Sequence, residues 1–359
     1  MAIIPLNQKF HTIENSVVTQ ERGSALVNSQ KEIFVTQDII DTVSAYVGLG
    51  GTQYVFVAAN GTDLQNAAEL QAAYVTAQGM SPSITNRITV IAAPGNYNFS
   101  TANFEMNTDY IDLVSLDGNK SIVFNGSNTI EITTNDVFVR GVDVGTLNFT
   151  IANSLNLLRV ENCSGGDNSF GGGLGGTADG TFTDCSGGDF SFGGNSGTAS
   201  GTFTNCSGGD KSFAGDGGTA DGTFTDCSGT DFSFGGGGTA DGVFTNCTGG
   251  FDSFGGGGGT ASGTFTDCSG VNNSFGAFGT ASGVFTNCTG GKSSFGSGGT
   301  ASGVFNSCIG GDRAFGGGGG GTLNGFLYYC RLTSGTFVTV SVGGRTMYCI
   351  DGNNNINNQ

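Results

Sequence analysis

The stretch GTASGTFTNCSGG, residues 197–209, decides the fold, because close variants of these thirteen letters occur seven times in succession between residues 176 and 311. One such unit cannot bury an apolar face alone, but stacked copies can bury a continuous core. The 68 glycines would also suit a disordered chain, yet the 29 phenylalanines and a hydrophobic fraction of 36% supply apolar surface to bury. A repeat architecture is therefore the first hypothesis.

Nine of the ten cysteines lie in register, at intervals of 20 to 22 residues. These nine are Cys163, Cys185, Cys206, Cys227, Cys247, Cys268, Cys288, Cys308 and Cys330. A phenylalanine stands three residues before seven of them, at Phe182, Phe203, Phe224, Phe244, Phe265, Phe285 and Phe305. A second phenylalanine follows the first eight cysteines by seven residues, as Phe213 follows Cys206. Length varies only after this second phenylalanine, which places the insertions in one loop.

The residues from Ala199 to Thr204 alternate between small or apolar side chains and hydroxyl-bearing ones. This period of two predicts a short strand with one buried face. Short strands, glycine corners and rungs of about 20–22 residues predict an all-β parallel β-helix, or β-solenoid, in which phenylalanine, alanine and cysteine form inward ladders. An amyloid-like or disordered glycine-rich array is the alternative, although neither requires a constant spacing between phenylalanine and cysteine.

The cysteines in register are predicted to be buried thiols that pack as small apolar side chains. Adjacent rungs would place their Cα atoms about 4.8 Å apart, a separation that permits a disulfide, so cross-rung disulfides are the second interpretation. The sequence contains no CxxC pair and no cluster of cysteine and histidine, and a zinc site is not expected.

The residue before each cysteine alternates along the array, as in Asp184, Asn205 and Asp226. Carboxylates on every rung would lie about 4.8 Å apart and repel each other, so the intervening asparagines separate the charges and allow hydrogen bonds along the ladder. Duplication of a two-rung unit would give the same alternation, and the two interpretations are compatible.

The chain is predicted to divide into four segments, namely residues 1–45, 46–160, 161–318 and 319–359. In the second segment, Thr62 and Gln65 form a capping box that begins a helix ending near Gly79, and a strand follows at residues 87–91. The order strand, helix and strand, with PGNY at residues 94–97, resembles the start of pectin-lyase-like parallel β-helices. That resemblance covers residues 51–160 and implies that the helix caps the open end of the solenoid.

The last segment, residues 319–359, has longer runs of β-branched and aromatic residues, such as FVTVSV at residues 337–342. We predict that it forms a C-terminal β cap, because an uncovered last rung would expose core and strand edges.

The first segment contains ERGSALVNSQKEIFVTQDIIDTV at residues 21–43, which resembles the N-terminal part of structural proteins of tailed bacteriophages. The resemblance implies an attachment segment that docks a fibre or spike to the virion. The residues themselves indicate a short amphipathic helix over residues 37–46 and polar extended chain. A flexible arm is the alternative.

The formal net charge of −17 and the scattered positions of the 12 lysines and arginines argue against nucleic acid and anionic membranes as partners. No apolar run is long enough to cross a bilayer, and the first residues do not have the pattern of a secretory signal. We therefore expect synthesis in the host cytoplasm and release by lysis.

Catalysis is not expected, because the chain has one histidine, His11, and no tryptophan. Parallel β-helices often cleave polysaccharides with paired carboxylates, and Asp179 and Asp184 could in principle act as such an acid and base. A polysaccharide-degrading tailspike is thus one alternative. No cofactor is expected, although calcium bound by the acidic ladder is an open alternative.

Outward threonines flank several inward phenylalanines, as Thr202 and Thr204 flank Phe203. They resemble the T-x-T ladders of antifreeze β-solenoids, so ice binding is a further alternative. The pattern is interrupted by Val243 and Val284, and threonine is also a common outward residue of ordinary strands.

The sequence is best interpreted as a structural protein of a tailed-phage virion, such as a tail fibre, tailspike or head fibre. The resemblance implies other virion proteins as partners and a homotrimer, and a host cell-surface polysaccharide is the natural receptor. The residues that break the repeat are the candidate receptor contacts, namely Leu174, Asn195, Asp216, Phe251, Lys292 and Arg313.

Overall fold

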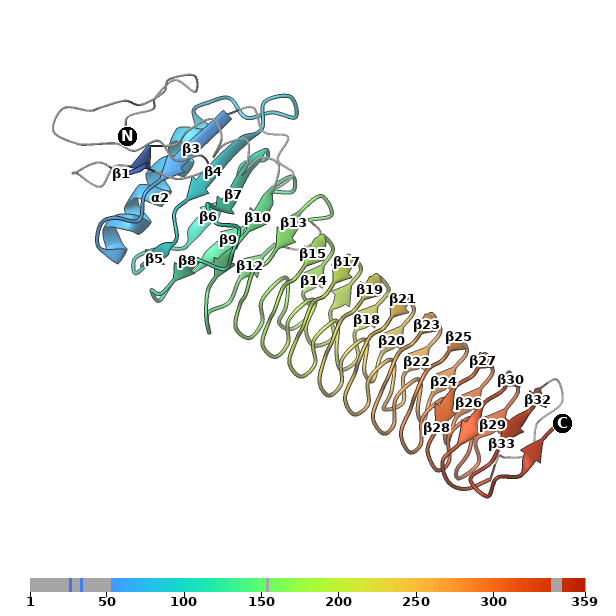
Figure 1. The fold of residues 1–359 in the computed structure, drawn as a ribbon. Coiled ribbons are helices and arrows are strands. Elements are labelled where there is room, and N and C mark those ends of the chain that lie inside the picture. The colour runs from blue at the N-terminus through green and yellow to red at the C-terminus, as the bar shows by residue number, and fades with distance from the viewer. Residues whose placement is uncertain (1–25, 28–32, 35–52, 153–154, 337–343, 359) are drawn as a thin grey trace, which may run out of the picture. The chain divides into compact units, whose positions relative to one another are not determined.

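The structure is a computed structural model that describes residues 26–27, 33–34, 53–152, 155–336 and 344–358. It confirms the predicted fold class, an all-β parallel β-solenoid of about 12 turns with rungs of about 21 residues and one short helix. The chain divides into two compact units, which are described in turn, and Figure 1 colours the ribbon by residue number. Unit 1 comprises residues 1–145 with 161–163, and unit 2 comprises residues 146–160 with 164–359. The predicted division into four segments stays a prediction.

Unit 1 contains the predicted helix and strands of three parallel sheets. The helix α2, Asp63–Gln78, begins at the N-cap Thr62, and Thr62 and Gln65 form the expected capping box. Its side chains Leu70, Tyr74 and Ala77 are buried, and it packs against strands β3, β4, β5 and β7. The strands of this unit are β3 Gln53–Val57, β4 Ile88–Ala92, β5 Gly95–Tyr97, β6 Phe104–Met106, β7 Ile111–Ser115, β8 Ile122–Phe124, β9 Ile130–Ile132, β10 Phe138–Arg140 and β11 Val142–Asp143.

Successive turns of unit 1 pair strand on strand. β3, β4, β7 and β10 are neighbours in the first sheet, and β5, β8 and β11 form the second. β6 pairs with β9 in the third sheet. The predicted strand at residues 87–91 corresponds to β4. Near the N-terminus, β1 Leu26–Val27 pairs antiparallel with β2 Ile33–Phe34, while the helix predicted over residues 37–46 lies outside the described residues.

Unit 2 begins with β12 Thr150–Ile151 and β13 Arg159–Glu161, whose last residue belongs to unit 1, and continues with two strands in every repeat. The first strand of each repeat is β14 Thr177–Ala178, β16 Thr198–Ala199, β18 Thr219–Ala220, β20 Thr239–Ala240, β22 Thr260–Ala261, β24 Thr280–Ala281, β26 Thr300–Ala301 and β29 Thr322–Leu323. The second is β15 Thr181–Thr183, β17 Thr202–Thr204, β19 Thr223–Thr225, β21 Val243–Thr245, β23 Thr264–Thr266, β25 Val284–Thr286, β27 Val304–Asn306, β30 Phe326–Tyr328 and β32 Arg345–Met347.

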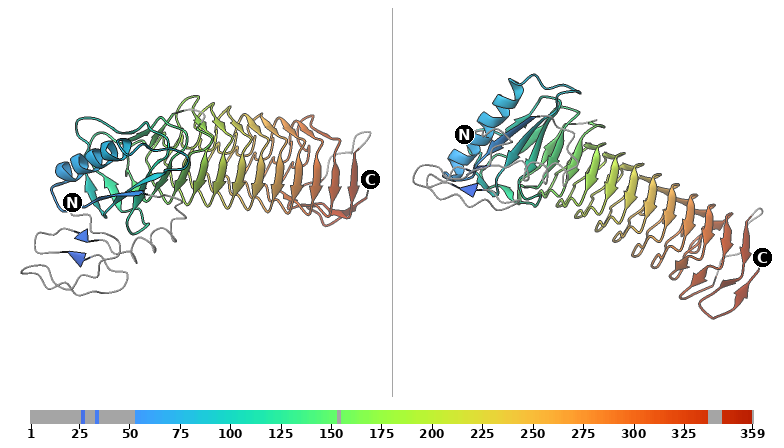
Figure 2. Two further views of the ribbon diagram at one scale, coloured as in Figure 1. Left: turned by 90° about the horizontal axis from the view of Figure 1, so that it is seen from above. Right: turned by 45° about the horizontal axis from the view of Figure 1, so that its top comes forward.

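Strands of neighbouring repeats pair parallel and in one register, so that each residue lies opposite its counterpart. Phe203, for example, lies opposite Phe182 on one side and Phe224 on the other. Figure 2 shows the resulting stack of strands from β15 to β32. A one-residue slip would turn every phenylalanine outward, and the buried face therefore fixes the register.

The core of unit 2 consists of two phenylalanine ladders, and the ring planes of one ladder are perpendicular to those of the other. The rings of Phe224 and Phe244 stack with centroids 4.8 Å apart and an interplanar angle of 3°. Phe234 of the second ladder meets Phe244 edge to face, at 5.9 Å and 89°. Both arrangements are favourable geometries for aromatic pairs. The structure places Phe182, Phe203, Phe224, Phe244, Phe265, Phe285 and Phe305 in the first ladder, all fully buried.

A glycine column allows the backbones of successive rungs to approach closely. A Cβ atom built on Gly242 would lie 2.2 Å from the carbonyl oxygen of Gly222, and one built on Gly263 would lie 2.2 Å from that of Gly242. Real Cβ atoms do not come this close to an oxygen, so only glycine fits here. This column accounts for part of the unusual glycine content.

The C-terminal β cap predicted over residues 319–359 is not confirmed. β29, β30 and β32 continue the sheets of the array in parallel register. A third sheet comprises β28 Ile309–Gly310, β31 Arg331–Leu332, β33 Cys349–Ile350 and β34 Ile356–Asn357. Within it, β34 runs antiparallel against β33. The last described rungs therefore belong to the solenoid itself.

Candidate functional site

Nine of the ten cysteines belong to unit 2, and Cys163 belongs to unit 1. All ten cysteines are buried free thiols, including Cys349, which sequence reasoning had left out of the register. Cys206 Sγ lies 3.4 Å from the carbonyl oxygens of both Phe182 and Thr204, and its single S–H can donate to either. Burial raises the pKa of the Cys206 thiol well above its ordinary value. All ten thiols are buried in the solenoid, and this burial supports a packing role for the column.

The alternating Asp and Asn residues form the expected ladder. The side-chain amide of Asn205 donates to Asp184 Oδ1 at 2.6 Å, and that of Asn246 donates to Asp226 Oδ1 at 2.7 Å. The predicted hydrogen bonds between rungs are thus confirmed. The structure adds a reason that the sequence did not supply: these residues have left-handed backbones, with a φ of 54° at Asp184, and Asp and Asn tolerate this region best after glycine.

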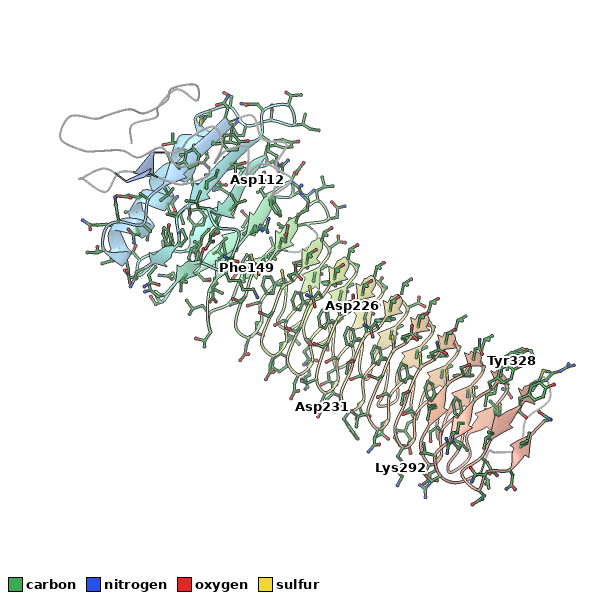
Figure 3. The ribbon with its side chains drawn as sticks, in the orientation of Figure 1. Asp112, Phe149, Asp226, Asp231, Lys292 and Tyr328 are labelled. Carbon is green, nitrogen blue, oxygen red and sulfur yellow. The ribbon has the colours of Figure 1, made fainter. Side chains whose placement is uncertain are left out.

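A second column of carboxylates, which sequence reasoning missed, links the backbones of several successive rungs at another corner. Asp167 Oδ1 accepts from the backbone N–H of Asp189 at 2.9 Å, and Asp189 Oδ1 accepts from that of Asp210 at 2.9 Å. Asp231, labelled in Figure 3, accepts from the N–H of Phe251 at 2.7 Å. These acids stand three residues before the second phenylalanine of their rungs, and this constant spacing could have revealed the column in the sequence. They satisfy backbone donors and are not a reactive cluster.

The six candidate receptor residues are spread over the array. Leu174, Asn195 and Asp216 follow the second phenylalanine of three consecutive rungs, and Leu174 is 85% exposed. Phe251, Lys292 and Arg313 precede the second phenylalanine of three later rungs. The structure places the whole set between the rungs of Phe170 and Phe315 and does not bring the six side chains together.

Two of these residues, Asp216 and Phe251, have recognisable neighbours. Asp216 Oδ2 accepts from Lys211 Nζ at 2.8 Å. Lys211 Nζ lies 5.8 Å from the ring centroids of both Phe190 and Phe232, on the rungs before and after its own. Phe232 in turn meets Phe251 edge to face at 6.3 Å. Sequence reasoning missed Lys211, and this cation between two aromatic rings stabilises the corner.

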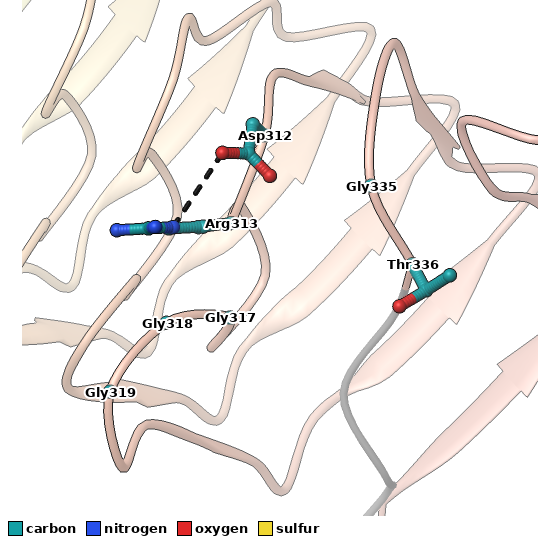
Figure 4. A pocket seen from close by; sticks show the side chains of 7 residues that line it. All are labelled: Asp312, Arg313, Gly317, Gly318, Gly319, Gly335 and Thr336. Carbon is teal, nitrogen blue, oxygen red and sulfur yellow. Dashed lines mark ion pairs between the residues drawn. The ribbon is translucent and has the colours of Figure 1, made fainter.

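Arg313 lines a pocket of about 630 Å³, shown in Figure 4. The pocket is lined by Asp312, Arg313, Gly317, Gly318, Gly319, Gly335 and Thr336. Arg313 Nε lies 3.6 Å from Asp312 Oδ2, and both side chains are largely exposed. The pocket is lined by one exposed ion pair and four glycines, which have no side chains to contact a ligand. It therefore offers weak polar contacts and no acid–base pair.

Unit 1 contains a buried ion-pair network. Arg87 Nε lies 2.7 Å from Asp112 Oδ2, and its NH2 group lies 2.7 Å from Asp136 Oδ1. Burial alone would lower the pKa of Arg87, but the two carboxylates outweigh it and raise the pKa. Asp112, labelled in Figure 3, also accepts from the backbone N–H of Phe138 at 2.7 Å. The network joins β4, β7 and β10 and is structural.

Neither polysaccharide cleavage nor calcium binding is supported by the arrangement of the acidic side chains that the structure describes. Asp184 accepts the amide of Asn205, and Asp179 Oδ1 accepts the hydroxyl of Ser200 at 3.2 Å. Within the described residues, no group of three or more His, Cys, Asp or Glu side chains is arranged to hold a metal ion. In the same part of the chain, no helix is long and apolar enough to cross a membrane.

The outward threonines do form an aligned strip. Thr181, Thr202 and Thr223 lie opposite one another and are exposed, whereas the threonines on the other side of each phenylalanine are half-buried. Val243 and Val284 occupy the same exposed positions further along.

Comparison of the chain with protein families, with curated proteins and with solved structures gives no match in any of the three.

Proposed function

We propose that the protein is a structural component of a tailed-phage virion, a fibre or spike with a rigid shaft. The N-terminal segment docks it to the particle, the solenoid projects away, and the protein has no catalytic activity. The observation that carries this proposal is the in-register stacking of β15 to β32, which rests as far as β27 on two phenylalanine ladders. The likeness of residues 21–43 to phage structural proteins supplies the virion context.

Rigidity follows from the contacts between rungs. Each central rung contributes two stacked phenylalanines, a buried cysteine and several backbone hydrogen bonds to each neighbour, such as Thr223 N–H to Gly201 O at 3.0 Å. Bending such a column would open close-packed ring stacks on one side, and packed interiors resist this strongly. A stiff spacer is the mechanical property that an appendage needs. The proposed homotrimer and the host surface glycan belong to the same hypothesis.

The decisive experiment asks whether the protein is part of the particle. Phage particles carrying the gene would be purified by density gradient and analysed by quantitative mass spectrometry and immunogold labelling. We expect the protein at a fixed copy number per particle, at one structural location. Its absence from purified particles, with abundant protein in the lysate, would refute the proposal.

Two deletions sharpen this experiment. Deletion of residues 1–45 should leave a folded shaft that particles no longer incorporate. Deletion of residues 218–237, one whole repeat, is the matched control and should be incorporated with a shaft shorter by one rung. If the N-terminal deletion were still incorporated, the docking role would be wrong. Light scattering on the purified protein tests the trimer, since a monomer would contradict that part.

Ice binding is the second candidate, because Thr181, Thr202 and Thr223 form an aligned, exposed strip of hydroxyl groups. Its test is thermal hysteresis of the wild-type protein and of Thr202→Leu. A hysteresis that the substitution abolishes would favour ice binding over a purely structural role.

A further inference from the structure

The outward side chains change character in the last rungs of unit 2. In an array rung the four outward positions around the second strand and the following corner hold Thr264, Thr266, Asp267 and Ser269. The register places Phe326 and Arg345 in the first of these columns, after Val304. It places Tyr328 and Met347 in the second column, after Asn306.

The two remaining columns change in the same way. Tyr329 and Tyr348 occupy the corner position that upstream rungs give to Asp or Asn, with φ angles of 53° and 55°. In the last column Arg331 lies between Ile309 and Ile350. We call Phe326, Tyr329, Arg331, Arg345, Met347 and Tyr348 the terminal face. These residues lie on β30, β31 and β32 or in the turns that follow β30 and β32, at the end of unit 2 in Figure 1.

The terminal face is exposed and aromatic. Phe326 is 37% exposed, Met347 41%, Tyr348 56% and Tyr329 63%. The two tyrosine rings stack on each other, with centroids 5.4 Å apart and an interplanar angle of 8°. A left-handed backbone disfavours tyrosine, so these rings stand where the rung geometry would prefer Asp or Asn. Large exposed aromatic patches of this kind mark interaction sites.

The terminal face is also cationic in an acidic protein. The whole chain carries a formal charge of −17, yet no Asp or Glu occurs between Asp312 and Asp351, a stretch that contains Arg313, Arg331 and Arg345. Among the described residues, neither Arg331 nor Arg345 takes part in an ion pair. Arginines without carboxylate partners beside exposed rings suit a ligand that brings its own negative charge.

We propose that the terminal face binds an anionic polysaccharide. The stacked rings of Tyr329 and Tyr348 pack against sugar rings, and Arg331 and Arg345 pair with carboxylate, sulfate or phosphate groups of the glycan. This inference rests on the proposed role of the protein as an appendage that meets a host surface. A symmetric contact between two copies would bring the arginines of both together, and this repulsion argues against self-association through the face.

The test uses the full chain and three anionic probes: polygalacturonate, dextran sulfate and a polyglycerol phosphate, with neutral dextran for comparison. Affinity electrophoresis and titration calorimetry would be run at about 50 and 500 mM NaCl, because ion pairing weakens with salt. We expect binding to at least one anionic probe, none to dextran, and weaker binding at the higher salt concentration.

Substitutions then locate the site. Arg331→Gln with Arg345→Gln should weaken binding by about tenfold or more, because two charge-assisted contacts are lost. Tyr329→Ala with Tyr348→Ala should weaken it by about fivefold or more, whereas the matching Phe substitutions should retain it. Arg159→Gln, at an exposed position of β13, and Asp267→Ala, on an upstream rung, are the matched controls and should change affinity less than twofold. Urea midpoints check that every variant is folded.

The outcomes separate this inference from the proposed function. No binding to any anionic probe, or binding that survives all four changes on the terminal face, overturns the inference even if the protein is found in particles. Binding that depends on the face, in a protein that particles lack, overturns only the virion proposal. A molecular mass that falls when Arg331 and Arg345 are replaced would assign the face to contacts between copies instead.

Discussion

Replacing Gly242 by alanine tests the central feature of the shaft, the close approach of successive backbones. The new Cβ would lie 2.2 Å from the carbonyl oxygen of Gly222, so the two rungs must separate locally by roughly 1 Å. The hydrogen bonds from Val243 N–H to Gly222 O at 2.9 Å and from Gly242 N–H to Ala220 O at 3.0 Å would then be stretched or lost. Overpacking costs about 1–3 kcal/mol and each lost bond about 1 kcal/mol, so we expect the free energy of unfolding to fall by about 3 kcal/mol.

The assay is urea unfolding followed by far-ultraviolet circular dichroism, with Gly319→Ala as the matched control. A Cβ at Gly319 meets nothing within 4 Å, and its backbone is outside the left-handed region. This control should leave stability unchanged or raise it by about 0.5 kcal/mol, because alanine restricts the unfolded chain. Equal midpoints for Gly242→Ala and the wild type would refute the argument that the rungs stack backbone on backbone.

Four further predictions concern the ladders and unit 1. Phe244→Ala removes a ring stacked on both sides and should lower the free energy of unfolding by about 3–5 kcal/mol in the same assay. Asn246→Asp replaces the amide that donates to Asp226 and places like charges on adjacent rungs, so the urea midpoint should fall and partly recover in about 1 M NaCl. The hydrogen bond from Thr134, with two backbone N–H groups, lowers the pKa of Asp109. Because the pKa of Asp109 is lower in the folded protein than its unfolded value of about 4, the ionised carboxylate stabilises the fold above about pH 4. This stabilisation is lost as the pH falls through the folded-state pKa. Asp109→Asn should therefore reduce the loss of stability between about pH 5 and 3. A thiol reagent should titrate fewer than one cysteine in the native protein and all ten after denaturation, since all ten are buried; several reactive thiols in the native state would contradict the column.

The array was predictable because its signals are local and repeated. The constant spacing from Phe203 to Cys206 fixes which side chains share a face, and the Thr62–Gln65 capping box fixes where the helix begins. The position of Cys349 was not predictable in the same way. Its rung has Thr346 where the array has phenylalanine, and the preceding rung has Leu327, so the pattern fades although the backbone register continues.

The candidate site was harder to predict than the fold. Residues such as Leu174 and Lys292 break the repeat, but a break in a pattern does not tell on which rung its spatial neighbours lie. The left-handed corner at Asp184 was also hidden, because a preference for Asp and Asn suits both a hydrogen-bonded ladder and a positive φ. Only the three-dimensional register aligns Tyr329 with Tyr348.

The confinement of length changes to one glycine-rich loop has a consequence for how the gene can vary. Loss or duplication of one whole repeat, by recombination between similar stretches of DNA, joins two rungs that already present matching columns to each other. Each event would change the length of unit 2 by one ring-stacking distance, 4.8 Å at Phe244 and Phe265, and would leave both ends of the unit intact. The length of unit 2 would therefore vary with the number of repeats, in steps of one rung and with the same core in every rung.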